Sequence, residues 1–176
     1  MNSQKSKADS IIFRRPELKD ASGIHNLIKR SPPLDVNSLY CYLLLCDHFR
    51  NTCIVAEKDR KVIGFIAAYL PPTKLDTLFV WQVVVAKPLR NRSLATKMLN
   101  KLLQSTPVLY IETTVTPSND ASMRFFRAFA HAREATLLSA AGYARDLFGD
   151  NSHEEELLLR LGPFDGGNQT IKGDIL

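Results

Sequence analysis

Hydrophobic positions recur along the chain with both strand-like and helix-like spacing, and the most apolar segment lies near the middle. Residues 77–85 (TLFVWQVVV) are β-branched and aromatic, a run that is long enough for a central strand and too short to cross a membrane. A basic loop containing Lys87, Arg90 and Arg92 follows, and residues 93–104 then have the pattern of an amphipathic helix. The apolar face of this helix is predicted to consist of Leu94, Met98, Leu99, Leu102 and Leu103.

Shorter predicted elements flank this segment on both sides. Those before it are a strand at 11–13, a helix at 19–30, a helix capped by Asn37 or Ser38 that runs to about Asp47, and a hairpin of strands at 52–57 and 62–70. Those after it are a strand at 108–115, a helix with Ala121, Phe125, Ala128 and Phe129 on its apolar face, and a strand at 156–161. Three successive strands without an intervening helix predict an α/β fold of the α+β kind, a mixed antiparallel and parallel sheet with helices on both faces.

Length and composition are those of one soluble globular domain. The 176 residues are 45% hydrophobic, and we expect a domain at 11–164 with mobile termini at 1–10 and 165–176. Residues 1–10 are polar and contain no apolar signal core, so a cytoplasmic protein is expected, with no membrane association. The net charge of +5 is not concentrated in a long basic run, which argues against nucleic acid and favours a local site for a small anion.

The cysteines and histidines do not have the spacing of a metal site. Cys41, Cys46 and Cys53 form no C-x-x-C pair, and no two of the four histidines are spaced as ligands. We therefore expect reduced, partly buried thiols and no metal.

The basic loop after the central strand is a candidate anion site. Backbone N–H groups and the positive end of a helix dipole point into such a loop, and arginines add charge-assisted hydrogen bonds. The alternative is an ordinary connection with solvated arginines. Arg90, Ser93 and Ala95, however, fall where the GCN5-related N-acetyltransferase (GNAT) family carries the acyl-CoA-binding pattern Arg/Gln-x-x-Gly-x-Gly/Ala, and the order of the predicted elements resembles that fold.

Within that family the chain resembles the diaminobutyrate acetyltransferases of ectoine synthesis. The resemblance is carried by PPLDVNSLYCYLLLCDHF (32–49), DTLFVWQVVV (76–85), ETTVTPSNDAS (112–122) and LLRLGPF (158–164). It implies an acetyl-CoA-dependent N-acetyltransferase that acetylates the 4-amino group of L-2,4-diaminobutyrate, a role in osmotic stress, and a homodimer.

The resemblance also implies the cofactor contacts. Backbone groups of Val83 and Val85 would pair with the pantetheine arm. Asn119 would lie on the cofactor side, although it is also a candidate helix cap. The pyrophosphate would be held by loop N–H groups from Arg90 to Thr96, including those of Ser93, Leu94 and Ala95. Ser93 stands where glycine is usual, so somewhat weaker CoA binding is expected.

Acyl transfer to an amine requires the amine to lose its proton. With a pKa near ~10.4, the neutral form costs roughly 4–5 kcal/mol at pH 7. Glu112, a carboxylate in the apolar strand VLYIETTV, is the candidate base or ammonium anchor, with a salt bridge as its alternative role. By the same resemblance, the expected substrate-binding residues are Asp35, Trp81, His153, Tyr40 and Thr113.

Other interpretations remain open at this level. Asp35 has the alternative of capping a turn, and His153 that of an ordinary solvated histidine. Phe125 and Phe126 occupy the region where many GNAT members carry an acidic tyrosine, which leaves water, the substrate ammonium or Tyr143 as the acid. One alternative function is an acetyltransferase of the same fold that acts on another amine, such as a polyamine or a protein N-terminus. A non-catalytic acyl-CoA-binding module is a further alternative.

Overall fold

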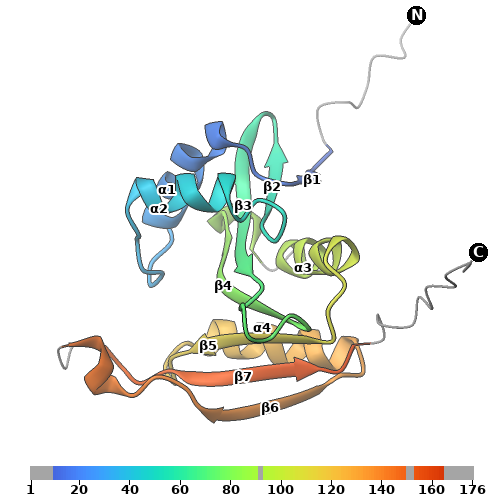
Figure 1. Ribbon diagram of the computed structural model, residues 1–176. Helices are drawn as coiled ribbons and strands as arrows, with labels where there is room; N and C mark the ends of the chain where they lie inside the picture. The colour runs from blue at the N-terminus through green and yellow to red at the C-terminus, as the bar shows by residue number, and fades with distance from the viewer. Residues whose placement is uncertain (1–9, 91–92, 150–152, 165–176) are drawn as a thin grey trace, which may run out of the picture. The chain divides into compact units, whose positions relative to one another are not determined.

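The computed structural model describes residues 10–90, 93–149 and 153–164 (Figure 1). Hydrogen bonds join its strands in the order β1-β2-β3-β4-β5-β7-β6. The chain divides into two compact units. Unit 1 is built from the described residues of Met1–Tyr69 and Val80–Thr106, and unit 2 from those of Leu70–Phe79 and Pro107–Leu176. The central strand β4 (Thr77–Val85) therefore contributes to both units, and its bounds are those predicted from the sequence.

Unit 1 carries three α-helices on an antiparallel arrangement of strands. Its other elements are β1 (Ile12–Arg14), η1 (Leu18–Asp20), α1 (Ala21–Lys29), α2 (Leu39–Asp47), β2 (Ile54–Lys58), β3 (Lys61–Tyr69), η2 (Lys87–Leu89) and α3 (Leu94–Ser105). Strand β2 pairs antiparallel with both β1 and β3. The connection between β2 and β3 is shorter than predicted, because Lys58 and Lys61 pair with each other and leave a two-residue turn. Asp59 and Arg60 in that turn both have positive φ, as a type I′ turn requires.

Helices cover both faces of the strands in unit 1, as predicted. One core cluster joins residues of α1 and α2 with Val55, Phe65 and Ala67. Successive side chains of a strand point to opposite faces, so Ala56 and Gly64 face the other way, where α3 packs (Figure 1). A Cβ atom at Gly64 would lie 2.8 Å from the Met98 sulfur, so the glycine provides the space that this α3 side chain fills.

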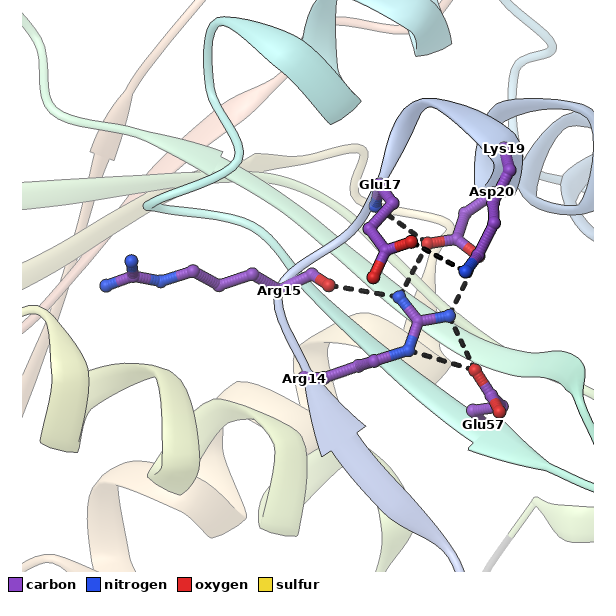
Figure 2. A network of polar contacts seen from close by, with 6 residues as sticks. All are labelled: Arg14, Arg15, Glu17, Lys19, Asp20 and Glu57. Atoms are coloured by element: carbon purple, nitrogen blue, oxygen red, sulfur yellow. Dashed lines mark hydrogen bonds and ion pairs between the residues drawn. The ribbon is translucent and has the colours of Figure 1, made fainter.

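A network of charged side chains fastens β1 to β2 and to η1 (Figure 2). The Arg14 guanidinium donates to Asp20 at 2.7 and 2.9 Å and to Glu57 at 2.5 and 2.9 Å. Asp20 is buried and also accepts from the Glu17 backbone N–H at 2.7 Å. Burial raises the pKa of the Asp20 carboxyl, but the hydrogen bonds from Arg14 and Glu17 outweigh burial and lower it.

Unit 2 pairs β5 with strands on both of its sides. Its elements are the first residues of β4, β5 (Tyr110–Val115), α4 (Asp120–Ala132), β6 (Thr136–Ala141), η3 (Arg145–Phe148) and β7 (Leu157–Gly162). Strand β5 runs parallel to β4 through Thr77, Leu78 and Phe79, and antiparallel to β7. Strand β6 pairs antiparallel with β7 (Figure 1). These pairings confirm the predicted mixed sheet. Strand β6 was not among the elements predicted from the sequence.

The apolar face of α4 differs from the prediction. Phe126, Phe129 and Ala130 are its buried residues, whereas Ala121 and Ala128 are exposed. The helix carries alanine and phenylalanine on adjacent faces, so its periodicity alone is compatible with more than one buried face. The Phe129 ring packs edge-on against Phe164, 6.2 Å between centroids, and this contact with the segment after β7 selects the face.

Candidate active site

The basic loop ends in unit 1 at a helix N-terminus whose first N–H groups are not capped by the preceding side chain. Ser93 is the N-cap residue of α3 and has φ 56° and ψ 17°, a left-handed conformation in which its side chain makes no capping hydrogen bond. Its carbonyl accepts from Lys97 N–H at 2.9 Å, as the first bond of the helix. The N–H groups of Leu94, Ala95 and Thr96 precede that bond and have no partner within the helix.

This arrangement fits an anionic phosphate ligand. N–H groups at a helix N-terminus and the helix dipole favour negative charge, and the exposed Arg90 stands at the same loop. The Arg90 Nε donates to the Val85 carbonyl at 3.1 Å, which ties the loop back to the end of β4. Asn91 and Arg92, which belong to the predicted loop, lie outside the described residues.

Ser93 adopts a left-handed conformation, which glycine takes without a steric penalty, at the position where the family pattern has glycine. A residue with a Cβ adopts this conformation at a cost of roughly 1–2 kcal/mol. The serine keeps the loop geometry and does not supply the cap that serine usually gives.

A buried polar network in unit 1 holds the loop that carries Asp35. Gln82 of β4 donates from Nε2 to the Asp35 carbonyl at 2.9 Å and accepts at Oε1 from the Tyr42 hydroxyl at 3.3 Å. The Asn37 N–H in turn donates to the Tyr42 hydroxyl at 3.2 Å. The exposed Asp35 is therefore anchored through its backbone, and its position depends on Gln82, which the sequence reasoning did not single out.

The other predicted residues of unit 1 lie on β4 and α2. Trp81 is 43% exposed and Tyr40, in the first turn of α2, is 68% exposed, so both aromatic side chains are available to a ligand. Val83 and Val85 lie further along β4. The three residue pairs that join β4 to β5 end at Phe79 and include neither valine.

Glu112 is the charged residue buried in β5 of unit 2, and it is paired with two cations. Its residue is 4% exposed. Lys74 Nζ donates to both carboxylate oxygens at 3.0 Å, and Arg160 of β7 donates to Oε1. Arg160 lies directly opposite Glu112 in the antiparallel register, and its guanidinium stacks 3.8 Å above the centre of the Tyr110 ring. The salt bridge that sequence reasoning weighed as an alternative role is thus present.

Two further predicted residues of unit 2 are Thr113, whose side chain points to the face of β5 opposite to that of Glu112, and Asn119, which lies at a helix start. Thr113 follows Glu112 in β5, is buried, and donates from Oγ1 to the Thr114 carbonyl at 3.4 Å. Asn119 accepts at Oδ1 from the Ser122 N–H at 3.1 Å and is the N-cap of α4. The capping role considered for Asn119 is therefore confirmed, and its carboxamide N–H₂ group is not used in that cap.

His153 of unit 2 contacts residues that are close to it in the sequence. Its ring stacks on Phe148 with centroids 3.9 Å apart, and Nδ1 lies 2.6 Å from the Glu154 carbonyl. Because a carbonyl only accepts, Nδ1 carries the hydrogen in that contact. Nε2 is 4.0 Å from the Glu156 carboxylate. The ring is therefore held in place rather than freely solvated. Tyr143, a candidate acid, is 50% exposed.

Four residues of these networks escaped sequence reasoning, and two of them carried a usable signal. Arg160 is a charge in the apolar strand LLLRLG and Gln82 is a polar residue in TLFVWQVVV, and each such residue needs a buried partner. Nothing in the sequence singled out Tyr42 or Lys74, because a tyrosine in a helix and a lysine in a loop are common and do not require a buried polar partner.

Neither a metal cluster nor a membrane-spanning helix is found in the part of the chain that the structure describes. No group of three or more His, Cys, Asp or Glu side chains among residues 10–90, 93–149 and 153–164 is placed to hold a metal ion. Within the same ranges, no helix combines the length and apolarity needed to cross a bilayer. The three cysteines are free thiols. Burial raises the pKa of Cys46 and of Cys53 to about 12.

Comparison with known proteins gives matches over most of the chain. Residues 21–130 match the model of the Acetyltransferase (GNAT) family. The chain is 42% identical over 167 residues to the L-2,4-diaminobutyric acid acetyltransferase of Marinococcus halophilus, covering 93% of this chain and 96% of that protein. It is 45% identical over 156 residues to the enzyme of the same name from Bordetella parapertussis, covering 86% and 84%.

Solved structures agree with these sequence matches. The diaminobutyrate acetyltransferase EctA from Paenibacillus lautus, in complex with its substrate L-2,4-diaminobutyric acid and coenzyme A, superposes with a TM-score of 0.84 at 42% identity, covering 88% of this chain and 96% of that one. Ard1 from Thermoplasma volcanium superposes with a TM-score of 0.66 at 14% identity, covering 86% and 95%, which shows a common fold.

Proposed function

Because this chain belongs to the GNAT acetyltransferase family, and within it to the L-2,4-diaminobutyric acid acetyltransferases, we propose that it transfers the acetyl group of acetyl-CoA to the 4-amino group of L-2,4-diaminobutyrate. The product is N4-acetyl-L-2,4-diaminobutyrate, an intermediate of ectoine synthesis. One observation carries this conclusion. At 42% identity, 88% of the chain superposes on an enzyme whose structure holds that diamine and coenzyme A.

The reaction defines what the side chains must do. Acetyl-CoA supplies an acetyl thioester, so a C–S bond breaks, a C–N bond forms, one proton leaves the amine and one reaches the thiolate. We assign Glu112 to the substrate amine, either as the base that accepts its proton or as the anchor of its ammonium form. Its burial supports this assignment, because a carboxylate interacts with an ammonium more strongly where water is excluded.

Most of the cofactor contacts are assigned to the loop and strand of unit 1, and Asn119 of unit 2 is added to them. The N–H groups of Leu94, Ala95 and Thr96, together with Ser93 and Arg90, hold the pyrophosphate. Backbone groups of Val83 and Val85 pair with the pantetheine arm, and their absence from the residue pairs between β4 and β5 supports this role. Asn119 contributes its carboxamide N–H₂ group.

The substrate contacts are assigned to one further carboxylate, two aromatic residues, a histidine and a threonine. Asp35 faces the ammonium groups of the diamine. A second carboxylate in the site favours a substrate with two ammonium groups over an amino acid that has one. Trp81 and Tyr40 form apolar walls with a polar edge, which their exposure supports. His153 donates to the substrate carboxylate. Thr113 follows Glu112 in β5, so its side chain points to the other face of the strand, and it is assigned to the pocket only as a supporting residue.

We further propose a cytoplasmic homodimer that serves osmoprotection. Strand β6 is the last strand in the sheet order, and its residues TLLSAA carry no charge. Leu138 on this strand and Leu147 after it are 60% and 69% exposed. An uncharged edge strand with exposed apolar side chains favours pairing with a second copy. Light scattering on the purified protein tests this, and a monomer at micromolar concentration would refute it.

Thiol release tests the reaction itself. Purified protein is mixed with acetyl-CoA and, in turn, diaminobutyrate, ornithine, lysine and putrescine, and free thiol is followed with a chromogenic disulfide. We expect release with diaminobutyrate and far less with the longer diamines. Equal rates with all four amines would refute the proposed substrate, and no release with any of them would refute the enzyme.

A matched pair of variants tests the role of Glu112. Glu112→Gln removes the carboxylate and is expected to lower kcat by about 10²-fold or more. Glu57→Gln is the control, because Glu57 is also a strand carboxylate paired with an arginine. Thermal melting of both variants ensures that only folded protein is compared. A Glu112→Gln enzyme as active as the control would remove Glu112 from the chemistry and leave it the structural salt bridge.

A further inference from the structure

The two cations that pair with Glu112 are held in different ways. Arg160 belongs to β7, lies opposite Glu112 in the strand register, and is stacked on the Tyr110 ring. The position of Arg160 is thus set by the pairing of β7 with β5 and by the stacking of its guanidinium on the Tyr110 ring. Lys74 belongs to the connection between β3 and β4, where its N–H donates to the Pro71 carbonyl at 2.9 Å, and its side chain is 47% exposed. Lys74 therefore reaches the buried carboxylate from a half-exposed turn.

Lys74 presents to Glu112 the same chemical group as the proposed substrate. Its side chain ends in a primary alkylammonium, and the 4-amino group of diaminobutyrate is a primary alkylammonium at pH 7. Its Nζ lies 3.0 Å from each carboxylate oxygen, the distance at which a bound substrate ammonium makes charge-assisted hydrogen bonds. Both oxygens of Glu112 are engaged by Lys74 and one also by Arg160. Three of the roughly four acceptor sites of the carboxylate are thus used, so a substrate ammonium that bonds to both oxygens must displace a donor.

We propose that Lys74 is an internal competitor of the diamine: it occupies Glu112 in the free enzyme and gives way to the substrate ammonium, while Arg160 stays. This inference rests on the proposed function. The competition follows from the geometry, because Lys74 bonds to both carboxylate oxygens, as a substrate ammonium there would, while Arg160 bonds to one. Lys74 then sets the affinity for diamines through Glu112, without contacting the reacting atoms, and is a positioning residue.

The exposure of Lys74 limits the strength of this competition. Pairs with a half-exposed lysine are stabilised little, because water and salt compete for the ammonium. The apparent dissociation constant equals the intrinsic one divided by the fraction of enzyme in which Glu112 is open. Removing the lysine is therefore expected to tighten diamine binding about two- to fivefold. Salt weakens the ion pair between Lys74 and Glu112. The ratio of the diaminobutyrate dissociation constants of wild type and variant is therefore expected to approach one near 1 M salt, where the Debye length is about 3 Å.

Three variants separate competition from a general effect of charge. Lys74→Gln removes the ammonium and keeps the length of the side chain, while Lys74→Arg keeps the charge. Lys19→Gln is the matched control, because Lys19 is another exposed lysine in an ion pair, with Glu17 at 2.6 Å. For each protein, calorimetry gives the dissociation constant of diaminobutyrate, and steady-state kinetics give KM for each substrate at low and high salt.

We expect Lys74→Gln to lower the dissociation constant and the KM for diaminobutyrate, with the KM for acetyl-CoA unchanged. Lys74→Arg and Lys19→Gln should bind the diamine as the wild type does. Unchanged or weaker diamine binding by Lys74→Gln, or a loss confined to kcat, would overturn the inference while leaving the proposed function intact. A wild-type enzyme that does not acetylate diaminobutyrate would instead refute the proposed function, and the inference with it.

Discussion

Replacement of Ser93 by glycine gives a direct test of the strained loop before α3. Ser93 has φ 56° and ψ 17°, and its side chain is exposed and makes no capping bond. Glycine adopts this conformation without the steric penalty of a Cβ atom. The substitution removes neither a hydrogen bond of the cap nor a buried contact, so its effect isolates the backbone conformation.

The magnitude follows from two opposing contributions. Relief of the left-handed conformation stabilises the folded state by roughly 1–2 kcal/mol. Glycine also has more freedom in the unfolded chain, which lowers the free energy of unfolding by about 0.5–1 kcal/mol. We therefore expect Ser93→Gly to be more stable than wild type by about 0.5–1 kcal/mol. Ser93→Ala keeps the Cβ atom and loses no cap, so its free energy of unfolding should stay within about 0.5 kcal/mol of wild type.

Ser38 provides the matched control, because it caps α2 in the ordinary way. Its backbone is extended, with φ −62° and ψ 153°, and its Oγ accepts from the Cys41 N–H at 3.2 Å. Ser38→Ala should therefore cost about 1 kcal/mol, and Ser38→Gly only a few tenths. Urea unfolding of the four variants measures these differences.

The two serines should thus respond in opposite ways to the same substitutions. A Ser93→Gly protein that is less stable than wild type, or a Ser93→Ala protein that is stabilised as much, would refute the argument from backbone strain. We also expect Ser93→Gly to bind coenzyme A more tightly than Ser93→Ala, because glycine leaves space beside the pyrophosphate. Equal affinities would show that the serine side chain does not hinder the ligand.

Three further predictions follow from buried groups. Burial raises the pKa of the Asp20 carboxyl, but hydrogen bonds, above all from Arg14, lower this pKa overall. The ionised Asp20 therefore stabilises the fold above its unfolded pKa near 3.8, and this stabilisation is lost as the pH falls through the pKa of the folded state. Asp20→Asn should lower the free energy of unfolding by about 1–3 kcal/mol at pH 7, and urea titrations should show this difference shrinking below about pH 4. Because burial raises the pKa of Cys46 and Cys53 to about 12, these thiols should react with an aromatic disulfide at pH 8 only after unfolding, which thiol counting with and without denaturant measures. Gly162→Ala should destabilise the fold by at least about 2 kcal/mol in thermal or urea unfolding, because φ is +136° and the new Cβ would lie 2.5 Å from a backbone oxygen.

The candidate site could be recognised in the sequence where one of its residues interrupts an apolar pattern. Glu112 was recognised because a carboxylate interrupts an apolar strand, and the structure shows it buried as that argument requires. Its partners were not recognised. Arg160 lies 48 residues further along the chain and meets Glu112 only because β5 and β7 pair in one particular register. Lys74 approaches from a turn whose sequence has no period that would orient its side chain.

Sequence periodicity and turn residues alone determined the elements, because these depend on residues within a few positions of one another. The bounds of β4 were predicted in this way, and the cap of α2 was narrowed to Asn37 or Ser38, of which the structure shows Ser38. The buried face of α4 and the partners of Glu112 were decided by tertiary structure. Long-range strand register and helix packing select among local patterns that are equally good, and no spacing within the chain encodes that selection.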